Sequence, residues 1–306
     1  MTAAAGSPVA LDLEYGPLGR DSWWLRAPDG AFLQVDGGTL AVLRAVDGRL
    51  PPEDAARELD LDRDDLAALL AALAAHGALR PGARPSLRPA QQPRDGARVW
   101  LAALALAAAL GALAQACFFL LGRPSLTVTG PAALAALLLV LATVPLHEGA
   151  HRLAARGCGT VRLGLTWAAV FPTLYVEAQG AWALSRSRRC AIDAAGVAAD
   201  TAAGGAAALA ALLAPAAAPA VTAFLLTQFA RTALALNPLL LSDGYWLLSD
   251  LTGVPNLSRR ARESLRALRL HWLTAYAALS YACAGLAAGL LALFLISVVA
   301  ALARAL

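Results

Sequence analysis

The sequence predicts a mainly α-helical, polytopic membrane protein with about five spans and a small α+β domain at its N-terminus. Of its 306 residues, 59% are hydrophobic and only 15% are charged, which is too apolar for a chain that faces water on all sides. The charges are also uneven: residues 1–85 hold 13 acidic residues and 8 Arg, whereas residues 86–306 hold 8 acidic residues and 17 Arg. The chain therefore divides into an acidic head and a basic membrane body.

Residues 1–80 are expected to form the head. The segment 22–35, SWWLRAPDGAFLQV, places two apolar runs around Pro-Asp-Gly, which is a hairpin signal. Apolar periodicity then predicts helices over 39–46, 52–59 and 62–76. Strands followed by three helices are typical of a winged-helix-like module. The N-terminus has no basic segment before an apolar core, so no cleavable signal peptide is predicted and the head is expected in the cytoplasm.

Residues 81–98 are expected to be a linker between the head and a membrane domain over 99–306. Four prolines recur at four-residue spacing in a segment that also contains several arginines. Proline opposes helix formation and favours extended backbone, so this segment is predicted to be a semi-rigid basic tether. The prolines are Pro81, Pro85, Pro89 and Pro93.

The membrane domain contains charge-free runs long enough for helices that cross a bilayer, which need about 20 apolar residues. The run over 201–242 contains one charge, Arg231, and is broken by Pro215 and Pro219, so it is expected to form two helices joined by a turn. The last run can hold either one tilted helix or a tight helical pair. The runs cover residues 99–122, 124–146, 201–242 and 270–303.

Arginine clusters orient these spans, because basic residues are retained on the cytoplasmic side of a membrane. Placing all four clusters inside keeps the head in the cytoplasm and puts the connections near 123–130 and 214–220 outside. We therefore expect a multi-pass protein of the cell membrane (the inner or plasma membrane). The clusters are Arg80/84/88/94/98, Arg152/156/162, Arg186/188/189 and Arg259/260/262/266/269.

Residues 157–183 do not fit a membrane span. Only 14 uncharged residues separate Arg162 from Glu177, and they are rich in Val, Thr, Tyr and Trp and contain Pro172. This composition predicts extended strands or a re-entrant hairpin. Such backbone is tolerated at membrane depth only where protein or a water-filled cavity covers it.

Residues 147–151, His-Glu-Gly-Ala-His, form an HExxH motif at the end of the second predicted span. Residues four apart lie on one helix face, so His147 and His151 can bind one zinc ion while Glu148 reaches a water molecule beside it. With four His in the chain, chance would produce the motif only about 0.001 times. The alternative is a polar helix end that frays into the cytoplasm beside Arg152.

A catalytic zinc ion usually has three protein ligands, so a third must come from another segment. The acidic candidates are Asp193, Asp200, Asp243 and Glu177. Asp243 is the strongest of them, because it follows the fourth predicted span at the depth expected for His147. The alternative is that Asp243 is an interfacial residue in a turn before a glycine.

The segment before Asp243 is expected to be irregular. Pro238 breaks the helix and frees a carbonyl group, and Asn237 can then bridge loose backbone or bind substrate.

HExxH in one membrane helix and NPxxxxDG, residues 237–244, in a later one resemble the site-2 protease group of intramembrane zinc metalloproteases. The string NPLLLSDGYWLLSDLTGVPNL is similar to the bacterial branch of peptide zinc metalloproteases found in peptide natural-product clusters. The resemblance covers roughly residues 130–270. It implies that His147, His151 and Asp243 are zinc ligands and that Glu148 is the catalytic residue.

One departure from that family concerns Asp200. Related proteins tend to have Ala-Gly-Pro followed by Asn, whereas this chain reads Ala-Gly-Val-Ala-Ala-Asp over 195–200. Asp200 could bind the substrate backbone, pair with Arg231 or compete as a zinc ligand. These three roles stay open at the level of sequence.

The order of elements in the head resembles the winged-helix recognition elements, related to the PqqD peptide chaperone, that bind leader peptides of ribosomally made, modified peptides (RiPPs). A leader strand would add to an exposed sheet edge, with Trp23, Trp24 and Phe32 as apolar contacts. A DNA-binding winged helix is the alternative, but a net charge of −5 opposes phosphate binding, so no nucleic-acid partner is expected. A purely structural head is a further alternative.

The expected function is an intramembrane zinc endopeptidase that cleaves a small or membrane-inserted peptide precursor, as in leader removal during RiPP maturation. Its partners would be the peptide substrate and the lipid bilayer, with export or modifying enzymes nearby. One alternative is a non-catalytic peptide receptor or maturation partner that keeps a relic HExxH motif. Others are a regulatory site-2 protease in signalling and a metal transporter.

Overall fold

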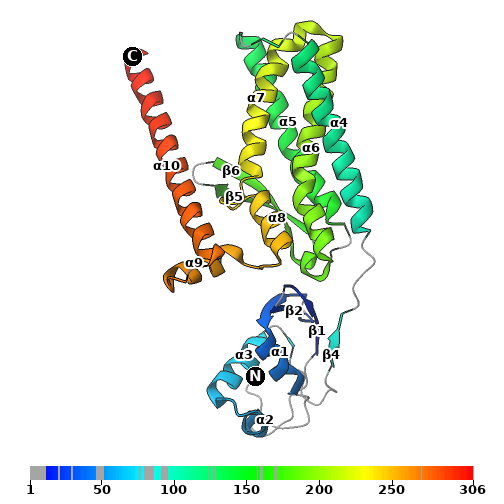
Figure 1. The fold of residues 1–306 in the computed structure, drawn as a ribbon, viewed down its shortest axis with the longest axis vertical. Coiled ribbons are helices and arrows are strands. Elements are labelled where there is room, and N and C mark those ends of the chain that lie inside the picture. The colour runs from blue at the N-terminus through cyan, green and yellow to red at the C-terminus, as the bar shows by residue number, and fades with distance from the viewer. Residues whose placement is uncertain are drawn as a thin grey trace. The chain divides into compact units, whose positions relative to one another are not determined.

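The computed structural model describes residues 12–305, except 20, 29, 46–51, 76, 79–85, 91–95, 123, 126, 128, 157, 159, 160, 169, 170 and 270. The chain separates into two compact units, and Figure 1 shows the helices and strands that they contain. The first, which we call the head unit, contains residues 1–96 and 155–189. The second, the helical unit, contains residues 97–154 and 190–306. Residues 155–189 thus group with the residues of the head in this division.

The helical unit is built from long, alanine-rich and leucine-rich helices, and so the mainly helical fold class is confirmed. The predicted break at Pro215 and Pro219 is also confirmed, because a short 3-10 turn separates α6 from α7 there. The elements are α4 (Ala97–Leu121), α5 (Gly130–Ala154), α6 (Arg186–Leu213), η2 (Pro215–Ala217), α7 (Ala218–Ala235), α8 (Asp243–Thr252), α9 (Leu257–Arg266) and α10 (Trp272–Ala305).

Three of the described helices, α4, α5 and α6, are long and apolar enough to cross a membrane. Two of them reach beyond the charge-free runs seen in the sequence. Helix α5 continues through the HExxH motif to Ala154, and α6 begins at Arg186, ahead of the run that starts at residue 201. The hydrogen bonds of a helix are made by its backbone, so a charged side chain does not by itself end it. The last run, for which two arrangements were open, is the single helix α10.

Helices α4 and α6 approach each other closely because glycines face each other. A Cβ atom on Gly111 of α4 would overlap the backbone carbonyl of Thr201 on α6, and one on Gly205 would overlap Gly111. Small residues permit such close packing between helices in a membrane. Beside this contact, Phe118 and Phe224 form the centre of a buried apolar cluster. This packing fixes the position of residues 200 and 201 along the axis of α6 relative to the neighbouring helices.

The head contains the predicted hairpin and helices. Strands β2 (Ser22–Arg26) and β3 (Phe32–Asp36) pair antiparallel, with Arg26 opposite Phe32. Helices α1 (Gly37–Ala45), α2 (Pro52–Glu58) and α3 (Arg63–Ala75) lie within a residue or two of the predicted bounds. The sequence did not indicate β1 (Asp12–Pro17), which pairs with β2.

The segment 81–98, for which a tether was predicted, contains a strand. Ser86–Pro89 form strand β4, which pairs parallel with β1, so the sheet has the order β3-β2-β1-β4. Pro89 is the last residue of an edge strand, a position that proline tolerates because its missing N–H is not needed there. The neighbouring residues 81–85 and 91–95 lie outside the described part of the chain.

The aromatic residues of the head differ in their availability. Trp24 is buried, and its ring lies against Gly16, so it cannot contact a peptide. Trp23 packs against Tyr15, and Arg44 lies 4.9 Å from the centre of the Tyr15 ring. Phe32 contacts Trp182 edge-on, with 6.4 Å between the ring centres. Trp182 belongs to η1 (Gln179–Ala183), which is part of the same unit.

Residues 157–183, for which strands or a re-entrant hairpin were predicted, contain a β-hairpin. Strand β5 (Val161–Ala168) pairs antiparallel with β6 (Phe171–Ala178) over their full length. The two strands form a sheet of their own, separate from the sheet of the head.

Helix α1 of the head is capped by Asp36, whose Oδ1 accepts a hydrogen bond of 2.6 Å from the Thr39 backbone N–H. This bond lowers the pKa of Asp36, so its stabilising effect is complete above the unfolded-state pKa of about 4 and is lost as the pH falls through the lower folded-state value. We expect Asp36→Ala to destabilise α1 by about 1 kcal/mol at pH 7, and by less below pH 4.

Hydrogen exchange of residues 37–45 at the two pH values measures this difference. Asp36→Asn is the matched control, because an amide caps equally well without a titratable charge. If the wild-type chain and Asp36→Ala differed by the same amount at both pH values, the assigned cap would be contradicted.

Candidate metal centre

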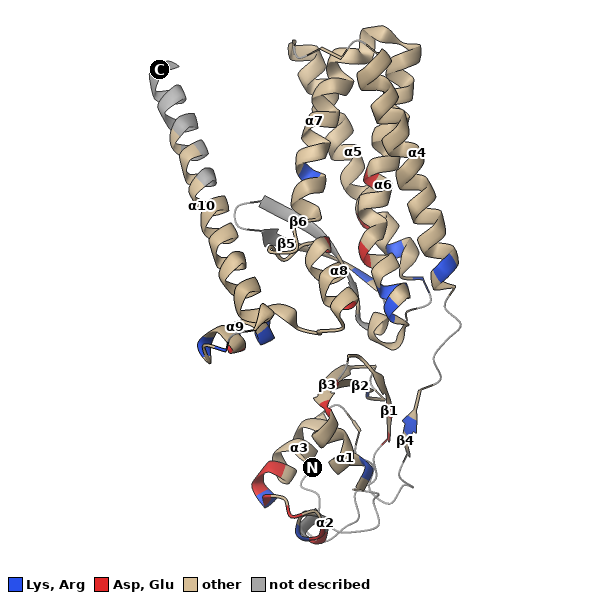
Figure 2. Ribbon diagram, viewed as in Figure 1, with Lys and Arg blue, Asp and Glu red and all other residues tan. Residues whose placement is uncertain are grey.

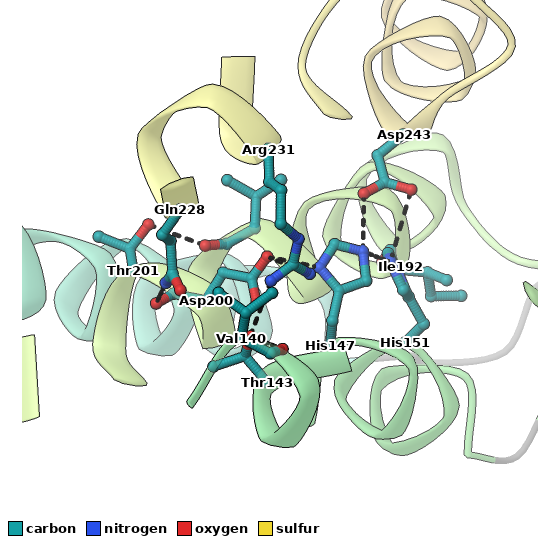
Figure 3. Close-up of polar contacts among 11 residues, drawn as sticks. Val140, Thr143, His147, His151, Ile192, Asp200, Thr201, Gln228, Arg231 and Asp243 are labelled. Carbon is teal, nitrogen blue, oxygen red and sulfur yellow. Dashed lines mark hydrogen bonds and ion pairs between the residues drawn. The ribbon is translucent and has the colours of Figure 1, made fainter. Parts of the chain in front are cut away.

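Helix α5 brings His147 and His151 together, because residues four apart lie one above the other on a helix face. The ring centres are 4.8 Å apart, and the two Nε2 atoms are 3.1 Å apart. His151 is buried and His147 is largely so. Both rings therefore turn the same nitrogen toward one point inside the helical unit (Figure 3).

Asp243, the first residue of α8, points at the same place (Figure 3). Its Oδ2 lies 3.1 Å from His147 Nε2, and its Oδ1 lies 3.5 Å from His151 Nε2. Among the residues that the structure describes, these three side chains form a group that could hold a metal ion, with all ligand atoms within 4.8 Å of one another. This agrees with the ligand set predicted from the sequence.

The loop before α8 holds Asp243 in position. Asn237 Oδ1 accepts a hydrogen bond of 3.0 Å from the Leu239 N–H, and the Asn237 carbonyl accepts one of 2.7 Å from the Ser242 hydroxyl. A Cβ atom on Gly244 would overlap the carbonyl of Leu236, so only glycine lets α8 start this close to the end of α7. The Asn237 side-chain amide also donates a hydrogen bond of 3.3 Å to Cys283 Sγ of α10. Substrate binding by Asn237 stays a prediction.

The outer nitrogen of each ring faces an acceptor. His151 Nδ1 lies 2.7 Å from the backbone carbonyl of Ile192, and His147 Nδ1 lies 2.9 Å from Asp200 Oδ2. A carbonyl and a carboxylate can only accept, so each Nδ1 is the nitrogen that donates, and a neutral ring then has its lone pair on Nε2. With both rings neutral, as metal binding requires, two lone pairs and a carboxylate would converge with no donor among them.

These residues fit a tetrahedral zinc ion. Zinc bonds of about 2.0 to 2.1 Å place tetrahedral ligand atoms about 3.3 Å apart, close to the 3.1 Å and 3.5 Å separations found here. The buried Asp243 Oδ2 has no hydrogen-bond partner among the described residues. Imidazole and carboxylate ligands suit zinc, whereas the absence of a thiolate from the group disfavours copper(I) and iron–sulfur clusters.

Gly196 is a site residue that the sequence analysis missed. A Cβ atom at this position would overlap the Nε2 atoms of both His147 and His151. Ile192, Gly196 and Asp200 are spaced four residues apart, so one face of α6 supplies an acceptor for His151, space at the ligand atoms and an acceptor for His147. The signal in the sequence was this four-residue spacing in α6, which matches the spacing of the histidines in α5.

We expect Gly196→Ala to remove the bound metal, because the added methyl group occupies the point on which the two Nε2 atoms converge. Gly149→Ala is the control, since Gly149 lies inside the HExxH motif but a Cβ atom there meets nothing within 4 Å. Metal content of the two purified variants, measured by mass spectrometry, checks this. Full occupancy in Gly196→Ala would place the metal elsewhere.

Asp200 lies behind His147 rather than among the ligand atoms. It is 1% exposed, and besides His147 it meets Arg231, whose Nη2 is 3.7 Å from Asp200 Oδ2. Of the three roles left open by the sequence, pairing with Arg231 is the one found in the structure. Asp193 is not in the metal-ligating group found among the described residues, and the side chain of Glu177, the other acidic candidate, lies outside the described part of the structure.

Glu148 occupies the position next to His147 on α5 and is half-buried. It lies in the electrostatic field of both histidines and of Asp200 and Asp243. A carboxylate in this position can hold a proton beside a metal without taking up one of the metal's ligand positions.

Comparison with models of protein families, with curated proteins and with solved structures gives no match to this chain.

Proposed function

We propose that the protein is an intramembrane zinc endopeptidase that cleaves a small or membrane-inserted peptide precursor. The observation that carries this proposal is the convergence of His147 Nε2, His151 Nε2 and the Asp243 carboxylate, with both outer ring nitrogens held by acceptors. Three protein ligands leave a fourth position for water or substrate, which distinguishes catalytic from structural zinc sites.

Zinc bound by His147, His151 and Asp243 would polarise a substrate carbonyl and make water acidic enough to attack at neutral pH. Glu148 then accepts the proton of the attacking water as general base. The same carboxyl group returns that proton to the leaving amine, so Glu148 ends the reaction as it began.

The substrate must be extended at the bond that is cut, because a helix hides its carbonyl groups in hydrogen bonds. A two-stranded hairpin has two outer edges, each able to accept a further strand. Strands β5 and β6 offer such edges to an extended peptide. Binding along an edge uses the substrate backbone, so it imposes extension without demanding one sequence.

The proposed membrane orientation places the head in the cytoplasm, with α7 and α10 completing a set of five spans. It is supported by the positions of the arginines: Arg98 lies near the start of α4, Arg152 near the end of α5, and Arg186 at the start of α6 (Figure 2). These three helix ends face the same side if the helices cross in alternate directions.

We expect a single cysteine introduced at residue 186 to be protected from an impermeant thiol reagent on intact cells, and one at 125 to be labelled. The native Cys117, Cys158, Cys190 and Cys283 are first replaced. Labelling at 186 with protection at 125 would invert the orientation.

The biological role that we propose is leader removal from a ribosomally made, modified peptide, with the head as the part that recognises the precursor. The sheet supports this, since β3 and β4 are its edge strands. Recognition through Trp24 is not proposed, because that side chain is buried. If the gene for this protein lies beside genes for a short precursor peptide and for modifying enzymes, this would support the role. A neighbouring gene for an anti-sigma factor would instead indicate a signalling protease.

The non-catalytic receptor remains the alternative function, and a cleavage assay separates the two. The protein, purified in lipid nanodiscs with zinc, is incubated with a pool of synthetic single-span peptides, and products are identified by mass spectrometry. We expect cleavage of one or more peptides, which stops when a zinc chelator is added and resumes when zinc is restored. Binding of peptides without any cut, at full zinc occupancy, would favour the receptor.

A further inference from the structure

A buried polar network lies behind His147 and joins helices α5, α6 and α7 (Figure 3). Asp200 on α6 accepts from His147 Nδ1 on α5 and lies beside Arg231 on α7. Arg231 Nη1 also donates a hydrogen bond of 2.7 Å to the Thr143 hydroxyl, which in turn donates to the carbonyl of Val140. None of these contacts is needed to complete the group of metal ligands.

We propose that Asp200 and Arg231 form a positioning pair that fixes His147 with its hydrogen on Nδ1 and its Nε2 lone pair directed at the metal. This inference rests on the proposed zinc centre. It assigns the unusual aspartate at 200 to the zinc site, behind a ligand rather than as a ligand or a substrate contact.

The chemistry of Asp200 explains why an acid suits this role. A carboxylate offers only acceptors, so the ring nitrogen facing it must be the one that carries the hydrogen. An asparagine at the same place could accept through its oxygen or donate through its amide, and it would therefore permit either tautomer. Ligating histidines commonly donate their outer N–H to a carboxylate or carbonyl, which orients the ring and strengthens it as a ligand.

Arg231 supplies the charge and geometry that a carboxylate needs in an apolar bundle. An unpaired buried carboxylate is costly, and a guanidinium group reduces this cost without offering an acceptor that could compete for the His147 hydrogen. Its two terminal nitrogens reach different helices, Thr143 on α5 and Asp200 on α6. Arg231 thus fixes Asp200 relative to the helix that carries both histidines.

The backbone of α6 at residues 200 and 201 is held by hydrogen bonds from two neighbouring helices. Gln228 on α7 donates to the carbonyl of Asp200, and Gln115 on α4 donates a bond of 2.8 Å to the carbonyl of Thr201. Both glutamines are buried. The bonds to α4 and α7 therefore fix the position of α6 along its axis, and with it the position of Asp200 relative to His147.

The test uses the full-length, zinc-loaded protein with ¹⁵N-labelled histidine, of which the chain has only four. The N–H of His147, bonded to a carboxylate, is expected further downfield in the proton spectrum than that of His151, bonded to a neutral carbonyl. Asp200→Asn should move the His147 signal and leave that of His151 in place. Zinc affinity, measured by competition with a chromophoric chelator, should fall about 10- to 100-fold, while the site still saturates.

Two further variants exclude a general structural effect. Glu263→Gln, the same change from acid to amide on the exposed side of α9, should alter neither readout. Arg231→Gln should shift the same histidine signal and weaken zinc binding, and the double variant should be no weaker than Asp200→Asn alone, because both changes act through one pair.

The inference is overturned if Asp200→Asn and Arg231→Gln both keep the wild-type signal and zinc affinity. It is equally overturned if the two histidine signals move together. If the proposed function is wrong, the result is different. The wild-type chain then binds no zinc, or binds zinc without cutting any peptide, and the variants at residue 200 behave in the same way.

Discussion

Glu148→Ala is expected to lower peptide cleavage about 10²- to 10⁴-fold while the protein keeps one zinc per chain. The physical reason is the division of roles in the HExxH motif. His147 and His151 present their Nε2 atoms to the metal position together with Asp243, whereas Glu148 is outside this ligand group. Its loss therefore removes the proton carrier without removing a ligand.

Parallel zinc analysis and cleavage assays on the same preparation measure the two effects. Glu148→Gln is the matched variant, since it keeps the size of the side chain and removes only its ability to accept a proton. Both variants should show the same decrease in cleavage. Cleavage near the wild-type rate in either one would assign the general base to another group, and loss of zinc in both would make Glu148 part of the ligand set.

Asp243→Ala is expected to have the opposite pattern, with loss of zinc and of cleavage together. Asp243 supplies the only carboxylate of the ligand group, and its two oxygens lie 3.1 and 3.5 Å from the two Nε2 atoms. Two imidazoles alone hold zinc weakly, so we expect the affinity to fall by more than about 100-fold, beyond the effect of a residue that only orients a ligand.

The control for this variant is Asp250→Ala, which removes an acid from the same helix, α8, but from outside the ligand group. Chelator competition across a range of zinc concentrations compares the two. Should Asp243→Ala keep its zinc while Asp200→Asn loses it, the assignments of ligand and positioning residue would be reversed.

The ligand set was predictable from the sequence because each member belongs to a short, local pattern. His147 and His151 are four residues apart on one helix, and Asp243 sits between a helix-breaking proline and a glycine that permits a close approach. Local patterns also allowed two other features to be predicted. Pro-Asp-Gly marks the turn between β2 and β3, and two prolines mark the break before α7.

Features that depend on contacts between distant segments were not predictable. Gly196 was missed because its importance comes from two rings on another helix, and the four-residue spacing around it acquires its meaning only from the approach of α5. The role of Asp200 stayed open for the same reason, as it depends on Arg231 and His147, 31 and 53 residues away. Strand β4 was taken for a tether because its composition is poor for helices, while its pairing with β1 spans more than 70 residues.

The proposed peptidase activity depends on one zinc ion held by His147, His151 and Asp243. The most direct test is a titration of the metal-free protein in nanodiscs with zinc, following cleavage of a synthetic peptide that the holoprotein cuts. Cleavage should rise in proportion to added zinc and level off at one equivalent per chain, and Asp243→Ala should stay flat over the same range. Cleavage by the metal-free chain, or none at full loading, would contradict the claim.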